Sequence, residues 1–156
     1  MVPRLLATVL LLVGADGIGT PTLRYFKEDH LTGADYLRLA SSGTYEVIGR
    51  EHMGIWKLDH GTWSAKADTW TFVSLETAGA TFTGRLVQAS GRTFFVWKGK
   101  DAPGIEVPES DIRADLKKAP KATPPYVFFE TSQDVFDRET QKRYPFKFYP
   151  EMNKDP

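Results

Sequence analysis

The chain of 156 residues contains 20 basic and 20 acidic residues, no cysteine, 41% hydrophobic residues and 13% aromatic residues. This length and composition fit one globular domain, and the balanced charge argues against a protein that coats nucleic acid. The absence of cysteine excludes disulfide scaffolds, metal sites with cysteine ligands and thiol nucleophiles.

The N-terminal segment has the pattern of a secretory signal peptide. Arg4 precedes an apolar run over residues 5–13, and Val13, Gly14 and Ala15 follow where a signal peptidase cleaves. The run is shorter than the roughly 20 residues of a transmembrane helix, and no second run of this kind follows. We therefore predict a signal peptide over residues 1–15 and export to the periplasm or the extracellular space, in a bacterium because cysteine is absent. The alternative is that the apolar run is a buried strand or helix of the fold.

Residues 16–125 are predicted to form a β-domain. Between Asp35 and Lys98, short segments of alternating hydrophobicity are separated by turn residues, which is typical of all-β proteins. Residues 35–40 and 44–50 are expected to be adjacent strands joined by a turn.

Tryptophans recur every seven residues between positions 56 and 70, but the glycine and β-branched residues among them favour strands over a helix. With a turn at residues 67–68, Trp63 lies opposite Phe72 and Ala65 lies opposite Trp70. This hairpin would have one aromatic face and one wet face, as in an antiparallel sheet that covers a core.

A second hairpin is predicted to turn at residues 90–91, and both of its faces are apolar. A second sheet, the C-terminal segment, a partner chain or a ligand must therefore cover the face that the first sheet leaves open. The predicted pairs are Val87 with Phe94, Leu86 with Phe95, Arg85 with Val96, and Gly84 with Trp97.

The C-terminal third is predicted to contain a short helix and an aromatic arm. Ser110 can cap a helix over residues 111–118, which Pro120 ends. Residues 126–156 carry too many aromatic side chains for a free tail, so we expect an aromatic arm that docks on the barrel or sandwich, as a strand or as an arm. These side chains are Tyr126, Phe128, Phe129, Phe136, Tyr144, Phe146, Phe148 and Tyr149.

The sequence gives little support for catalysis, a cofactor or a metal site. His52 and His60 would lie about 26 Å apart along an extended segment, so they are not expected to share a metal. His60 follows Asp59 directly, but such a pair without a placed nucleophile is not a catalytic triad. No phosphate-binding loop, nucleophile elbow or zinc-protease motif occurs.

Three short motifs resemble the strand repeats of small lipocalin-like secreted bacterial proteins of uncharacterised function. The motifs are Gly43-Thr44-Tyr45, Gly61-Thr62-Trp63 and Asp68-Thr69-Trp70-Thr71-Phe72. The resemblance covers about residues 35–98 and implies meandering strands around an aromatic core. In true lipocalins the Gly-x-Trp motif lies on the first strand, whereas Gly61-Thr62-Trp63 follows at least two predicted strands, so no pocket residue is carried over.

The sequence therefore predicts an all-β fold, an antiparallel meander forming a small barrel or sandwich with one short helix and the arm. We expect an exported, non-catalytic binding module for an apolar or aromatic small ligand or for a partner surface. The alternatives are a structural or interaction protein of the bacterial envelope with a filled core, and a hydrolase with an unrecognised site. No nucleic acid, cofactor or metal is expected. The candidate ligand-binding residues are Trp63, Trp70, Phe72 and Trp97.

Overall fold

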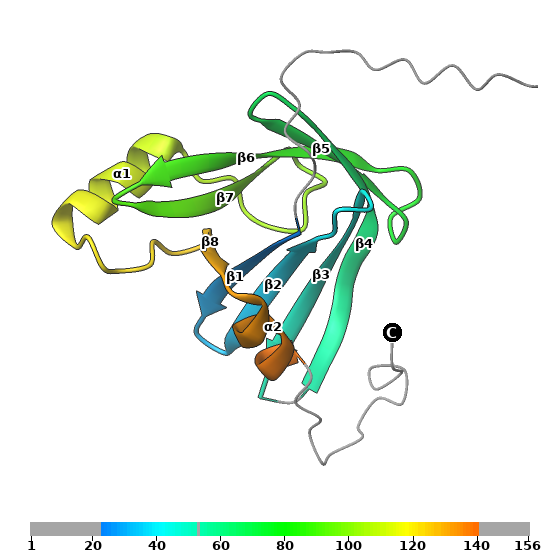
Figure 1. Ribbon diagram of the computed structural model, residues 1–156, viewed down its shortest axis with the longest axis horizontal. Coiled ribbons are helices and arrows are strands. Elements are labelled where there is room, and N and C mark those ends of the chain that lie inside the picture. The colour runs from blue at the N-terminus through cyan, green and yellow to red at the C-terminus, as the bar shows by residue number, and fades with distance from the viewer. Residues whose placement is uncertain (1–22, 53, 141–156) are drawn as a thin grey trace, which may run out of the picture.

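The computed structural model of the chain describes residues 23–52 and 54–140. Within them, eight antiparallel strands close into a barrel in which each strand pairs with the next along the chain (Figure 1). This confirms the predicted antiparallel meander and selects the barrel over the sandwich. The predicted signal peptide and the aromatic residues from 144 to 149 lie outside the described residues.

The strands are β1 (Arg24–His30), β2 (Gly33–Leu39), β3 (Thr44–Glu51), β4 (Gly54–Lys66), β5 (Thr69–Ser74), β6 (Thr81–Ala89), β7 (Arg92–Lys98) and β8 (Phe128–Thr131), and the helices are α1 (Glu109–Lys118) and α2 (Gln133–Thr140). In Figure 1 the strands β1 to β4 fan out below, and the β6–β7 hairpin crosses above them. Neither helix in the described part of the chain is long and apolar enough to cross a membrane.

Both predicted hairpins form in the predicted register. In the first, Trp63 pairs with Phe72 and Ala65 pairs with Trp70. The second turns at Ser90 and Gly91, whose φ angles of 50° and 68° are the left-handed values that a two-residue hairpin turn requires. The four pairs predicted between β6 and β7 are all present.

The barrel interior is filled mainly by aromatic rings. Phe72 stacks on Phe82 with ring centroids 5.5 Å apart, and Trp97 packs edge-on against both of them. The buried members of this core are Phe26, Leu37, Leu39, Tyr45, Val47, Trp63, Trp70, Phe72, Phe82, Phe95, Trp97 and Phe128.

Helix α1 covers the outer face of the β6–β7 hairpin. Ile112 and Leu116 pack against Val87, Phe94 and Val96, so a segment of the same chain covers the second apolar face of this hairpin. The helix starts earlier than predicted, because Pro108 is its N-cap residue and Glu109 its first residue. The prediction that Ser110 caps the helix is therefore wrong.

Helix α2, which the sequence reading did not predict, covers the outer face of β1 and β2. Phe136 packs on Tyr25 at 4.9 Å and edge-on against Tyr36 at 6.0 Å between ring centroids. Its start is marked by Ser132, whose hydroxyl oxygen accepts a hydrogen bond from the Val135 amide.

The described part of the predicted arm is built into the barrel. Strand β8 pairs with both β1 and β7 and so closes the sheet. Phe128 lies in the barrel core, whereas Tyr126 is 55% exposed. Residues 128–131 thus form a strand of the barrel.

Candidate functional site

The four residues proposed from the sequence as ligand contacts lie together in the barrel interior. Trp63 stacks on Trp70 at 4.8 Å, and Phe72 lies 5.2 Å from Trp97. Gly84, which pairs with Trp97, leaves no free space, because a Cβ at position 84 would lie 2.2 Å from the Phe95 ring. These rings therefore fill the space between them.

One level of the barrel interior is polar instead of aromatic. Phe26 pairs with Leu37 in the core, and two residues toward the β1–β2 turn Glu28 pairs with Asp35 on the same face. Asp35 in turn pairs with Gly49, and Gly49 pairs with Trp56. We call Glu28, Asp35, Gly49 and Trp56 the polar row; it runs across β1, β2, β3 and β4.

Glu28 has no side-chain partner among the residues that the structure describes. It is 8% exposed, and its carboxylate forms no hydrogen bond or ion pair with any residue that the structure describes. Neighbouring Asp35 has one partner, His30, whose Nε2 lies 3.5 Å from Asp35 Oδ1. The other ring nitrogen of His30 lies 3.3 Å from the Thr32 hydroxyl.

Burial at this level raises the pKa of both carboxyl groups. Burial, followed by the nearby charge of Asp35, raises the pKa of Glu28 to about 7 from its ordinary value of 4.5. Burial also raises the pKa of Asp35, against the opposing effect of His30. The fold therefore favours the neutral form of both acids relative to an ordinary carboxyl group.

At one end of the polar row, the Trp56 ring packs closely against Gly49, which has no side chain. A Cβ on Gly49 would lie 3.2 Å from the Trp56 ring and 3.2 Å from the Leu58 side chain. Leu58 is the extra residue of a bulge in β4, where the register with β3 shifts after Val47. Trp56 is half-buried and Leu58 is partly exposed, so this end of the row reaches the surface.

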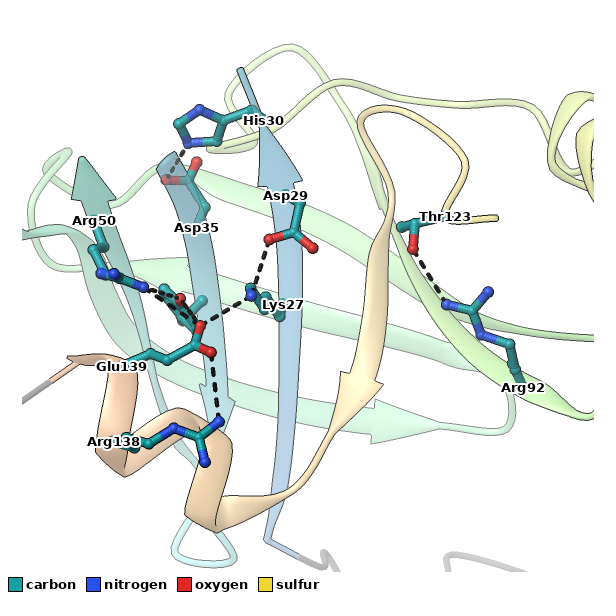
Figure 2. Close-up of polar contacts among 10 residues, drawn as sticks. Lys27, Asp29, His30, Asp35, Arg50, Arg92, Thr123, Arg138 and Glu139 are labelled. Atoms are coloured by element: carbon teal, nitrogen blue, oxygen red, sulfur yellow. Dashed lines mark hydrogen bonds and ion pairs between the residues drawn. The ribbon is translucent and has the colours of Figure 1, made fainter. Parts of the chain in front are cut away.

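The opposite face of the same strands carries an ion cluster that fixes α2. The Glu139 carboxylate accepts a hydrogen bond from Tyr36 Oη and lies 2.9 Å from Lys27 Nζ and 3.6 Å from Arg50 Nη1 (Figure 2). Burial opposes ionisation of Glu139, but the bonds from Tyr36 and Lys27 outweigh it and hold its pKa below the ordinary value. Lys27 also pairs with Asp29 at 3.0 Å.

A hollow of about 270 Å³ adjoins this ion cluster on the outer face of the strands. It is lined by Lys27, Asp29, Thr32, Gly33, Ala34, Arg50, Glu51 and His52.

The Asp59 and His60 pair noted in the sequence has a structural role. Asp59 is buried and accepts hydrogen bonds from Tyr45 Oη at 2.8 Å and from the Ser74 hydroxyl at 2.6 Å. The His60 ring points instead to Glu76, with 2.8 Å between Nδ1 and Oε1. Among the described residues, no group of three or more His, Asp or Glu side chains is arranged to hold a metal ion.

No family model matches the chain, and neither a curated protein nor a solved structure matches it. The lipocalin-like resemblance therefore stays a prediction.

The sequence reading missed Glu28, His30 and Asp35 as site residues. The available signal was alternation: Glu28 follows Phe26 by two residues and Asp35 precedes Leu37 by two, so each acid occupies a position that a strand turns inward.

Proposed function

We propose that this protein is an exported, non-catalytic binding module whose small ligand binds at the polar row. One observation carries the proposal: Glu28 is 8% exposed, faces Asp35 across the strands, and has no hydrogen-bond or ion-pair partner among the described residues. A buried charge normally has a partner, because desolvation is otherwise uncompensated.

The packing of the central core supports placing the ligand at the polar row instead of at the site proposed from the sequence. A ligand among Trp63, Trp70, Phe72 and Trp97 would have to displace rings that already contact one another. Displacing such contacts forfeits the burial that stabilises the core. At Gly49, by comparison, the neighbours are the partly exposed Leu58 and the half-buried Trp56.

The test is a protein-detected NMR screen of a fragment library that contains amines, acids and neutral apolar compounds. We expect binders to shift the indole N–H signal of Trp56. Gly49→Val should abolish those shifts, because its side chain would press against Trp56 and Leu58 and displace them. Gly54→Val is the matched control, since a Cβ there meets nothing within 4 Å.

Apolar compounds that shift the Trp63 and Trp70 signals and still bind Gly49→Val would place the ligand in the central core. If no compound binds in a Gly49-dependent way, the chain is better described as a structural or interaction protein, which the ring-filled interior also suits.

Export is part of the proposal and rests on Arg4 and the apolar run that follows it. N-terminal sequencing of the protein from the source cells should begin near Asp16. A cytoplasmic product that retains Met1 would contradict export.

A hydrolase is the second candidate function, because Thr32, His30 and Asp35 form a hydroxyl–imidazole–carboxylate series. In such a series the imidazole would accept the hydroxyl proton while the carboxylate orients the ring. Hydrolysis of p-nitrophenyl acetate that is lost in both Thr32→Val and Asp35→Asn would support this function. Equal rates for wild type and both variants would exclude it for this ester.

A further inference from the structure

The first half of strand β4 is an open edge of the sheet. Strand β5 pairs with β4 only over residues 61–66, so residues 54–59 pair with β3 on one side and with no described strand on the other. In Figure 1 this half of β4 forms the outer margin of the β1–β4 fan. An edge of this kind offers unpaired backbone groups to which a further strand can bind.

Apolar side chains accompany the open edge. Trp56 is half-buried and Leu58 is 36% exposed, and both lie against Gly49, so they share one face of the sheet. Edge strands usually carry charges that prevent further pairing, but Lys57 is the only charged residue in the sequence of residues 54–58. The edge therefore suits an apolar strand as its cover.

The described part of the chain ends close to this edge. Helix α2 reaches β3 near its end, where the Glu139 carboxylate lies 3.6 Å from Arg50 Nη1 (Figure 2). Arg50 pairs with Ile55 of β4. A strand added beyond β4 would lie two strand spacings, about 10 Å, from β3. The five residues from Glu139 to Tyr144 can span up to about 16 Å, so Tyr144 of the same molecule can reach the added position.

The sequence that follows α2 has the pattern of an edge strand. Tyr144, Phe146 and Phe148 occupy alternate positions, so in a strand their side chains would share one face. Pro145 has no N–H group, and a sheet tolerates proline where that group would face away from the neighbouring strand. The amides of residues 144, 146 and 148 would then face β4, and Pro150 would end the strand.

We propose that residues 144–149 add to the open edge of β4 as a further strand of the same molecule, with Phe146 and Phe148 beside Trp56 and Leu58. Aromatic and aliphatic pairs across neighbouring strands stabilise a sheet. This inference goes beyond the proposed function, because it assigns an interaction surface and its occupant instead of a small ligand.

Hydrogen exchange of the full chain tests the added strand. In wild type, amides of residues 54–59 that face away from β3 should be protected. Combining Phe146→Asp with Phe148→Asp places charges against the apolar face and should speed their exchange by at least about tenfold, with no change in the β6–β7 amides. Met152→Asp with Asn153→Asp is the matched control, since it adds the same charge beyond the proposed strand and should exchange as wild type does.

Introduced cysteine pairs locate the strand, because the chain has no cysteine of its own. Leu58→Cys is combined in turn with Tyr144→Cys, Phe146→Cys and Phe148→Cys. At least one pair should form a disulfide within one molecule, which requires Cα atoms within about 7 Å and is detected on non-reducing gels. Leu23→Cys replaces Leu58→Cys in the control. This residue is 45% exposed and precedes β1, which β2 and β3 separate from β4, so it should form no disulfide.

The outcomes distinguish the possible occupants of the edge. Disulfides found only between two molecules would assign the edge to the C-terminal segment of a second copy and overturn the proposal for the same molecule. Equal exchange at residues 54–59 in wild type and in the Phe146 and Phe148 double variant would overturn the added strand. So would the absence of a disulfide at all three positions. Circular dichroism monitors folding, and the cysteine pairs decide if the double variant is unfolded.

Discussion

The aromatic core and the polar row are two levels of one barrel interior, and they use opposite chemistry. In the core, rings such as Phe72 and Trp97 contact one another and are almost fully buried. In the polar row, Glu28 is buried to a similar degree but has no partner among the described residues. The core therefore supplies stability, whereas the row lowers stability when its carboxyl groups are charged.

The largest effect should come from breaking the aromatic core. Trp97→Ala removes a ring that packs on Phe72, Phe82 and Phe95, and it should lower the free energy of unfolding by about 3–5 kcal/mol. Urea denaturation followed by circular dichroism measures this change. Leu75→Ala, at a side chain 66% exposed, is the control and should change little. Similar midpoints for the two variants would mean that the core is not where stability resides.

At the polar row we expect a substitution to raise the free energy of unfolding instead of lowering it. The pKa of Glu28 is raised from 4.5 to about 7, so the fold favours the neutral acid. The associated stability is complete below pH 4.5 and is lost as the pH rises through 7. Glu28→Gln should remove this loss and be more stable than wild type at pH 8.5. Denaturation curves at pH 5 and 8.5 measure it, and parallel pH profiles for the two proteins would contradict it.

A smaller loss is expected when the outer ion cluster is broken. Glu139→Gln removes the charge that Lys27, Arg50 and Tyr36 share, and it should cost about 1–3 kcal/mol. The loss should concentrate in α2, so hydrogen exchange of the α2 amides should accelerate more than that of the core strands. Uniform acceleration would show that α2 and the barrel unfold together.

The smallest effect is expected on α1, beside the aromatic half of the barrel. Glu109 pairs with Arg85 and Arg113 at the exposed surface, and these partners lower its pKa. Solvent and salt screen such pairs, so Glu109→Gln should leave the thermal midpoint unchanged at physiological salt. A drop as large as that of Glu139→Gln would show that ion pairs matter equally on both helices.

The sequence predicted the parts of the fold that depend on near neighbours. The β4–β5 and β6–β7 hairpins were predicted pair by pair, because a two-residue turn fixes which residues face each other. The placement of Trp63, Trp70, Phe72 and Trp97 in one interior cluster followed from the same registers.

The sequence did not predict the polar row, because the row depends on barrel closure. We predicted strands only from residue 35 onward, and Arg24–His30 becomes β1 by pairing with β2 on one side and β8 on the other. The alternation of Phe26 with Glu28 indicates an inward position only once this segment is recognised as a strand. Helix α2 carried a usable local signal in Ser132, but we interpreted its segment as part of an extended arm.

Closure by β8 also has a consequence for the order of folding. Most strand pairs join neighbours along the chain, whereas Lys27 of β1 pairs with Phe129 of β8, and Arg24 reaches Glu130. Closing this long loop costs conformational entropy when β8 pairs with β1. We therefore expect the pairing of β8 with β1 to limit the folding rate. In stopped-flow experiments, Phe128→Leu should slow folding, whereas Phe82→Leu, within the local meander, should mainly speed unfolding. Until residue 131 is in place, β1 and β7 remain open edges, and an unfinished chain can associate with others through them.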